Sequence, residues 1–254
     1  MSQRRHRRAG SARRSPQAEA AARAPRLAAI DALRGLGLCL MVAYHLAFDL
    51  GYFRVIKVDF NHDPFWLASR ALIVSWFMFL VGVSLVLARR THPGLHPFWR
   101  RIALIVFCAV LVSAASYAIF PQSFITFGIL HAIAVASVLA RPLLPWPRTA
   151  LVLGVAVIVA GATLQFPLFD APWLNWVGMM THKPTTEDYV PLFPWFGVVL
   201  VGVAAGAWVT ARERKAVASL ERIAPRWLAW FGRHSLLVYM AHQPILFGIL
   251  RVIV

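Results

Sequence analysis

Seven long apolar segments take up nearly all of the chain after residue 27. An α-helix rises about 1.5 Å per residue, so roughly 20 apolar residues cross the hydrocarbon core of a bilayer. The segments are unbroken apolar runs without a period of two, which indicates helices and not the strands of a barrel. We expect these helices at residues 27–50, 67–88, 98–119, 124–140, 150–166, 190–209 and 228–254. The predicted fold class is therefore all-α, a polytopic membrane helical bundle of about seven transmembrane helices.

The composition agrees with a membrane protein, because 59% of the 254 residues are hydrophobic and only 14% are charged. The net charge of +16 lies mainly in the N-terminal tail and in the connections, so it indicates membrane topology and anionic-lipid contact, not nucleic acid. Arginine outnumbers lysine by 23 to 3, which suggests a GC-rich bacterial genome and hence a bacterial inner (plasma) membrane. Cys39 and Cys108 have no CxxC partner and no HExxH motif is present, so we expect no metal site.

The connections between the predicted helices are alternately rich and poor in basic residues. After the arginine-rich tail, the rich connections contain Arg89, Arg90, Arg100, Arg101, Arg141, Arg148, Arg212, Arg214, Lys215, Arg222 and Arg226. The other connections contain only Arg54, Lys57 and Lys183. The positive-inside rule therefore predicts a cytoplasmic N-terminus and a C-terminus on the outside. We expect residues 1–25 to form a disordered basic cytoplasmic tail and residues 26–254 to form one transmembrane domain.

Four ionisable side chains lie along the first predicted helix, namely Asp31, Arg34, His45 and Asp49. Such groups cost several kcal/mol inside a bilayer unless they are paired or hydrated, so they mark candidate functional positions. At about 100° per residue they fall within a sector of roughly 60° and cover about 27 Å of helix rise. Asp31 is spaced to pair with Arg34, and His45 with Asp49. A structural ion pair explains Asp31 and Arg34 equally well, but the whole stripe favours a polar cavity.

The other predicted helices add polar or aromatic side chains at matching depths, namely His131, Asp188, Trp195, Arg233, Ser235 and His242. A single histidine in a membrane often makes only a hydrogen bond between helices. Three of them, His45, His131 and His242, in seven short helices suggest a shared chemical role. Neutral histidine is a good general base or nucleophile near pH 7, with a carboxylate to orient it. We expect no serine-hydrolase site, because a GxSxG motif is absent.

Five sequence blocks occur in a fixed order between residues 26 and 250. They are RLAAIDALRG with MVAYH at 26–35 and 41–45, FMFLVGVSL at 77–85, FGILH at 127–131, DYVPLFPW at 188–195 and GRHSL at 232–236. Together these blocks resemble the heparan-alpha-glucosaminide N-acetyltransferase catalytic-domain family. The resemblance implies a membrane enzyme that transfers an acetyl group from cytosolic acetyl-CoA to an amino sugar on the far side. It also implies that a histidine is central to this step.

The resemblance leaves two candidates for that histidine. Animal members carry it shortly after the first helix, behind a Tyr-Phe pair, and here Tyr52 and Phe53 are followed after a longer gap by His62. Those members have an asparagine where this chain has His45, so both histidines stay candidates. Without the resemblance, His62 would be interpreted as an ordinary turn residue. The chain lacks the large N-terminal lumenal extension of the family, so lysosomal heparan sulfate is not implied as the acceptor.

We therefore expect an integral-membrane acyltransferase that uses acetyl-CoA, without a metal, to modify an amine or hydroxyl of an amino sugar or envelope glycan. The expected catalytic residues are His45, His62 and Asp49, with Asp63 as an alternative orienting carboxylate. Guanidinium groups pair well with phosphate oxygens, and the expected donor-binding residues are Arg34, Arg233, Asp31 and Ser235. The expected acceptor-side residues are His131, Asp188, Trp195 and His242.

Two other functions fit the same residues. A transporter or flippase for a polar or lipid-linked solute would use the stripe as a proton or ion pathway. An assembly or scaffold protein would use its polar side chains only to join helices. In each case we expect contact with membrane lipids and none with nucleic acid, and the sequence leaves open whether the chain forms a homo-oligomer.

The alternation of basic and non-basic connections makes the topology directly testable. A reporter that works only outside the cytoplasm should be active when it is fused after Val254 and inactive when it is inserted in residues 212–226. The converse pattern is expected for a reporter that works only in the cytoplasm. A cytoplasmic C-terminus would mean that the number of predicted spans is wrong by one.

Overall fold

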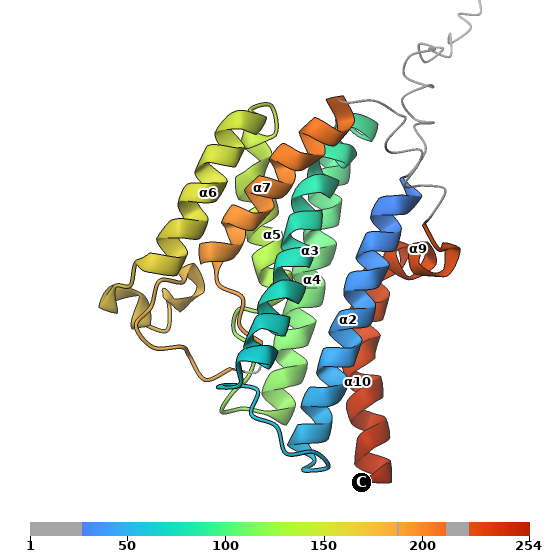
Figure 1. The fold of residues 1–254 in the computed structure, drawn as a ribbon, viewed down its shortest axis with the longest axis vertical. Coiled ribbons are helices and arrows are strands. Elements are labelled where there is room, and N and C mark those ends of the chain that lie inside the picture. The colour runs from blue at the N-terminus through green and yellow to red at the C-terminus, as the bar shows by residue number, and fades with distance from the viewer. Residues whose placement is uncertain (1–26, 187, 212–223) are drawn as a thin grey trace, which may run out of the picture.

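The computed structural model describes residues 27–186, 188–211 and 224–254, and within these ranges every regular element is a helix (Figure 1). The α-helices are α2 (Ala28–Tyr52), α3 (Pro64–Thr91), α4 (Leu95–Ile119), α5 (Ile129–Ala140), α6 (Pro147–Thr163), α7 (Leu192–Ala211), α9 (Arg226–Arg233) and α10 (Ser235–Ile253). Short 3-10 turns occupy Arg141–Leu143, Pro167–Asp170 and Asn175–Val177. The predicted all-α class is confirmed. The predicted tail at 1–25 and the basic residues 212–222 lie outside the described ranges.

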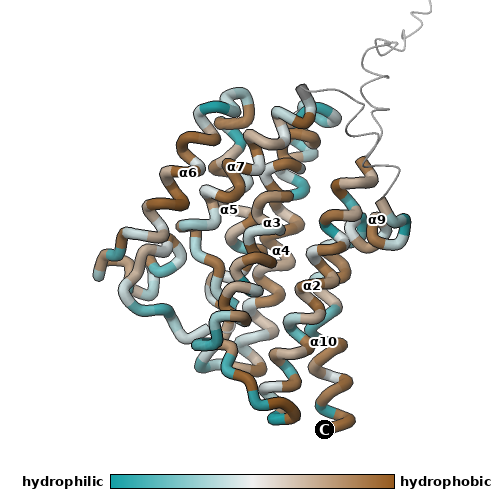
Figure 2. The backbone as a smooth tube through the Cα atoms, in the orientation of Figure 1, coloured by the Kyte–Doolittle hydropathy of each residue, from teal (hydrophilic) through white to brown (hydrophobic). Residues whose placement is uncertain are grey.

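Five of these helices, α2, α3, α4, α7 and α10, are long and apolar enough to cross a membrane. Helices α5 and α6 are apolar but shorter, with 12 and 17 residues. The chain is thus a multi-pass helical bundle, and the expected count of seven spans is not confirmed. Figure 2 shows hydrophobic residues along the helices, while hydrophilic residues gather in the connections and around α9.

Helix α5 begins at Ile129, so the prediction that it would start at residue 124 is wrong. The segment before it is held in a non-helical conformation by two serines of α4. Ser113 Oγ donates to the Ile125 carbonyl oxygen at 2.6 Å, and the Ile125 N–H donates to Ser116 Oγ at 3.0 Å. These contacts satisfy the backbone of Ile125 without a helical turn, which is why an apolar sequence there does not continue the helix.

The helices form two groups in Figure 1, with α3 to α7 in one and α2, α9 and α10 in the other. In the first group, α7 packs closely against both α3 and α6. A Cβ atom added at Gly82 would overlap with the Val199 carbonyl oxygen, and one added at Gly202 would overlap with the Phe79 carbonyl oxygen. Small residues at these crossings let the backbones approach, as expected for helices that associate within a membrane.

The predicted seventh helix, 228–254, is wrong as a single element, because the chain breaks at His234, where φ is −101° and ψ is 23°. The first part becomes α9, which crosses the start of α2, and the second part becomes the span α10. A Cβ atom on Gly232 would overlap with the Asp31 carbonyl oxygen, and one on Gly35 would overlap with that of Leu228. The close crossing therefore depends on two glycines far apart in the sequence, and hydropathy alone cannot reveal it.

The ends of the helices are arranged as the alternating arginines predict. Helix α2 begins, α3 ends, α4 begins and α7 ends at one end of the bundle, while the C-terminus lies at the other (Figure 1). We call the first of these the basic end, because Arg89, Arg90, Arg100, Arg141 and Arg148 lie at the helix ends there. The assignment of the basic end to the cytoplasm stays a prediction.

The crossing of α2 and α9 can be tested with a matched pair of glycines. Gly232→Ala should lower the melting temperature of the detergent-solubilised protein, because overpacking of this kind costs about 1–3 kcal/mol. Gly248→Ala in α10 is the control, since a Cβ atom there meets nothing within 4 Å. The control should leave the melting temperature unchanged or raise it, because alanine is the better helix former. Equal melting temperatures for the two variants would contradict the close crossing.

Candidate functional site

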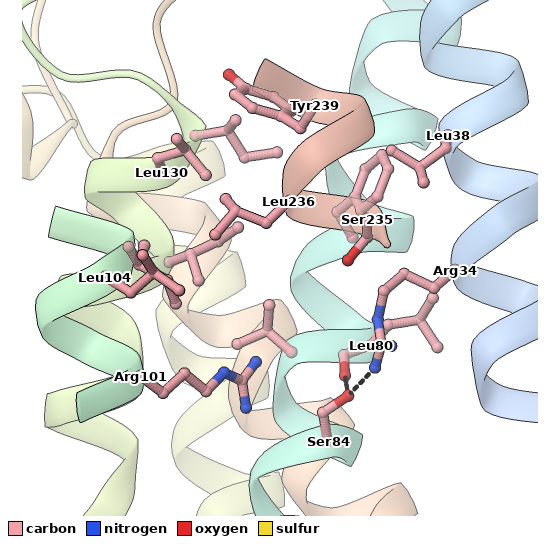
Figure 3. A pocket seen from close by; sticks show the side chains of 15 residues that line it. Arg34, Leu38, Leu80, Ser84, Arg101, Leu104, Leu130, Ser235, Leu236 and Tyr239 are labelled. Atoms are coloured by element: carbon pink, nitrogen blue, oxygen red, sulfur yellow. Dashed lines mark hydrogen bonds between the residues drawn. The ribbon is translucent and has the colours of Figure 1, made fainter. Parts of the chain in front are cut away.

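A cavity of ≈ 170 Å³ lies between α2, α3, α4, α5 and α10 (Figure 3). Its wall is mostly aliphatic, with Leu38, Leu80 and Leu130 among the lining residues. The polar lining consists of two guanidinium groups and three hydroxyl groups, namely Arg34, Arg101, Ser84, Ser235 and Tyr239. Cavities of this kind, apolar with a few polar groups, are typical of ligand sites.

Arg34 links three helices beside this cavity. Its Nη1 atom donates to Asp31 Oδ1 at 2.9 Å and to the Gly232 carbonyl oxygen at 3.3 Å. Its Nη2 atom donates to Ser84 Oγ at 2.8 Å, and Ser84 in turn donates to the Leu80 carbonyl oxygen (Figure 3). The ion pair expected from the spacing of Asp31 and Arg34 is therefore present, and it joins α2 to α3 and α9.

Arg101 is a cavity residue that the sequence analysis assigned to a connection. It lies inside α4, and its guanidinium points into the cavity in Figure 3. Within the described parts of the chain, Arg101 has no hydrogen-bond or ion-pair partner. A partly buried guanidinium without an anion is costly, so this side chain is a candidate for binding one. Arg101 shares its helical face with Ile105 and Cys108, and the burial of these two residues, which the sequence alone does not show, distinguishes it from Arg100.

Of the other residues expected to bind the acetyl donor, one lines the cavity and one does not. Ser235, the first residue of α10, lines the cavity together with Arg34. Arg233 does not line it, because it belongs to α9, is exposed, and donates from Nε to the Ala229 carbonyl oxygen at 3.3 Å. The structure thus brings Arg34, Asp31 and Ser235 together and places Arg101, not Arg233, as the second guanidinium of the site.

His45 and His242 form a pair between α2 and α10, with 3.2 Å between His45 Nδ1 and His242 Nε2. Their ring centroids are 4.9 Å apart. The His242 ring also packs on the ring of Tyr239, at 5.5 Å between centroids. Since Tyr239 lines the cavity, an unbroken series of side chains connects the cavity to the histidine pair.

The hydrogen bonds of the histidine pair determine its tautomers when both rings are neutral. His242 Nδ1 lies 2.6 Å from the Tyr239 carbonyl oxygen, which can only accept, so Nδ1 carries the proton. His242 Nε2 must then accept, and His45 Nδ1 must donate to it. This assignment follows from the hydrogen-bond pattern. It leaves a lone pair on His45 Nε2, which is the state that a general base requires.

Asp49 is almost fully buried, with a relative exposure of 1%. Its Oδ1 atom accepts a hydrogen bond from Gln243 Nε2 at 2.8 Å. Asp49 therefore bonds Gln243 on α10 and not His45, which its spacing on α2 had suggested. Asp49 Oδ2 and Gln243 Oε1 are both buried and have no hydrogen-bond partner in the described residues.

His62 and its neighbours form an exposed turn between α2 and α3. His62 Nδ1 lies 2.8 Å from Asp59 Oδ2, and the His62 side chain is 85% exposed. Hydrogen bonds, first of all from the His62 side chain, hold the pKa of Asp59 below its ordinary value. Asp63 caps the start of α3 by accepting from the Phe65 N–H at 2.8 Å. This geometry is that of a turn and a helix cap.

Asp188 and His131 each accept a hydrogen bond from the backbone at the start of α5. Asp188 Oδ2 accepts from the Ile129 N–H at 3.0 Å, and the Gly128 N–H donates to His131 Nδ1 at 3.3 Å. Partial burial raises the pKa of the Asp188 carboxyl group. Trp195, by contrast, packs against the hydrophobic core around α7. Of the expected acceptor residues, His242 is thus the one in the histidine pair, while Asp188 and His131 lie together elsewhere.

The chain matches a known protein family over most of its length. The family described as "Heparan-alpha-glucosaminide N-acetyltransferase, catalytic" matches residues 26–244, which is most of the chain. This match confirms the resemblance seen in the five sequence blocks. No curated protein and no solved structure matched the chain. Within the described residues, no group of three or more His, Cys, Asp or Glu side chains is placed to hold a metal ion.

Proposed function

Because this chain belongs to the heparan-alpha-glucosaminide N-acetyltransferase catalytic family, we propose that it transfers an acetyl group from acetyl-CoA to an amine or hydroxyl group across a bacterial inner membrane. The acceptor in this proposal is an amino sugar or envelope glycan on the outer side. The observation that carries the proposal is the continuity between a cavity with two guanidinium groups and a histidine pair with a lone pair on His45 Nε2.

The donor phosphates are assigned to Arg101 and Arg34. Arg34 already bonds Asp31, Ser84 and Gly232, whereas Arg101 has no polar partner among the described residues. Arg101 is therefore the main phosphate ligand in this proposal, and a guanidinium fork suits phosphate oxygens well. Arg101 lies near the basic end, where cytosolic CoA would enter. The aliphatic wall of the cavity suits the pantetheine arm of the donor.

The rise per residue of a helix gives the distance that the acetyl-CoA donor must span between the cavity and the histidine pair. Arg34 and His45 are 11 residues apart on α2, or about 16 Å, and Ser235 and His242 are seven residues apart on α10, or about 10 Å. An extended pantetheine arm spans such distances, so its thioester would reach the histidine pair while the phosphates stay near Arg101.

In the transfer step, the acceptor nitrogen or oxygen attacks the acyl carbon and its proton moves to His45 Nε2. The C–S bond then breaks, and the thiolate of CoA leaves and is protonated. The same Nε2 lone pair would serve if His45 first carried the acetyl group itself. His62 stays the competing candidate, although its exposed turn offers it fewer contacts than the half-buried His45 makes with His242.

The donor assignment predicts a selective effect of Arg101. With purified protein and radiolabelled acetyl-CoA, Arg101→Ala should weaken donor binding by about 1–3 kcal/mol, the value of a lost charged hydrogen bond, which is roughly 5- to 150-fold in Kd. Arg101→Lys should restore binding only in part, because a point charge lacks the fork. Arg100→Ala is the control, since Arg100 is exposed on the same helix turn. Unchanged donor affinity in Arg101→Ala would move the phosphate site elsewhere.

The chemical assignment predicts that His45→Ala lowers the rate of acetyl transfer by about 10²–10⁴ and leaves CoA affinity unchanged. His62→Ala should have a smaller effect, and His96→Ala, at an exposed position of α4, should have none. The measurement is single-turnover transfer from labelled acetyl-CoA to an amino-sugar acceptor. Full activity in the protein with both His45→Ala and His62→Ala would reject the histidine mechanism, whereas no transfer by the original protein would favour a transporter or flippase.

A further inference from the structure

Asp49 and Gln243 form one hydrogen bond with each other, while a second oxygen of each residue has no partner. Gln243 Nε2 donates to Asp49 Oδ1 at 2.8 Å, which leaves Asp49 Oδ2 and Gln243 Oε1 as two buried acceptors without a donor. Buried acceptors without partners are rare, since each has lost its hydrogen bonds to water. Here each of the two residues joined by one hydrogen bond carries such an acceptor, so a single explanation should account for both.

One proton on Asp49 Oδ2 completes both groups. A protonated carboxyl group and a primary amide each offer one donor and one acceptor on a shared carbon, so such a pair can form two parallel hydrogen bonds. Asp49 would then donate from Oδ2 to Gln243 Oε1 while Gln243 Nε2 donates to Asp49 Oδ1. A neutral carboxyl group also removes the cost of a charge in a span, where Asp49 is only 1% exposed.

A bound cation explains the two oxygens less well than a proton. A cation needs space and several further ligands, and neither Asp49 nor Gln243 lines the cavity beside Arg34 or the depression near Lys183. No lysine or arginine makes a recorded contact with Asp49 in the described part of the chain. The titratable residues nearest in sequence to Asp49 and Gln243 on the two packed helices are Tyr52 and His45 on α2 and His242 on α10. A proton on Asp49 Oδ2, unlike a cation, needs no cavity beside these oxygens.

The position of this contact gives it a role. Asp49 follows His45 by one turn on α2, and Gln243 follows His242 directly on α10. The next residue, Pro244, has no N–H, so α10 lacks a backbone hydrogen bond at this level. The hydrogen bond from Gln243 to Asp49 therefore stabilises α10 at the level where its own backbone lacks a bond. The distance between His45 and His242 depends on this contact, because it depends on how α10 lies against α2.

We propose that Asp49 is kept as a neutral carboxylic acid by Gln243, and that this acid–amide pair positions His242 against His45. Asp49 and Gln243 are positioning residues and do not touch the reacting atoms. The positioning role rests on the proposed transferase function, but the protonation of Asp49 does not.

The protonation is tested by infrared spectroscopy of the full chain in lipid at neutral pH. A protonated carboxyl group has a C=O stretch separate from that of a carboxylate, and Asp49→Asn should remove one such band. Asp170→Asn is the control, because Asp170 is exposed and hydrogen bonds, first of all from Thr181, lower its pKa, so no band should be lost. An unchanged spectrum in Asp49→Asn would overturn the proposal, even if the protein has no transferase activity.

The positioning is tested by acetyl transfer. Asparagine has the shape of the neutral acid and can make both hydrogen bonds, so Asp49→Asn should keep kcat within a few-fold of the original. Asp49→Ala and Gln243→Ala should each lower kcat by about 10- to 100-fold, as expected for a small displacement of a catalytic group, without changing CoA affinity. If Asp49→Asn loses as much activity as Asp49→Ala, a charged Asp49 is required and the proposal is wrong.

Discussion

The guanidinium group of Arg34 is the contact on which the arrangement of the site depends. It is bound at once by the Asp31 carboxylate, the Ser84 hydroxyl and the Gly232 carbonyl, so one side chain holds α2, α3 and α9 together. The third bond exists only because α9 crosses α2 at Gly35 and Gly232 with almost no space between the backbones. An arginine at this depth is stabilised by such a set of partners, because an unpaired charge inside a bilayer costs several kcal/mol. Arg34 and Ser84 of this set also line the cavity.

Much of the fold was predictable from the sequence, because a bilayer leaves a chain few alternatives. Backbone groups have no water to bond in the hydrocarbon, so long apolar runs become helices whatever their neighbours are. The parts that were mispredicted depend on distant residues. The start of α5 depends on Ser113 and Ser116 of α4, and the break at His234 depends on the glycine crossing with α2. Hydropathy does not contain this information.

The candidate site likewise has a part that the sequence predicts and a part that depends on distant residues. The stripe on α2 and the Asp31–Arg34 pair follow from the geometry of one helix, so spacing predicts them. Partners on other helices do not follow from spacing. His45 bonds His242, 197 residues later, and Asp49 bonds Gln243, 194 residues later. Arg101 was assigned to a connection because the alternation of arginines describes topology well and says nothing about which of two adjacent arginines faces inward.

Helix α9 has a consequence for how deeply the cavity lies in the membrane. It lies at the basic end, across the start of α2, with Trp227 and Trp230 exposed and with Arg226 and Arg233 at its two ends. Tryptophan and arginine prefer the level of the lipid headgroups, so we expect a short helix of this composition to lie along the membrane surface. The close backbone contacts at Gly35 and Gly232 fix the position of α9 relative to α2. We therefore expect α9 to keep Arg34 and the cavity at a constant distance below the headgroups.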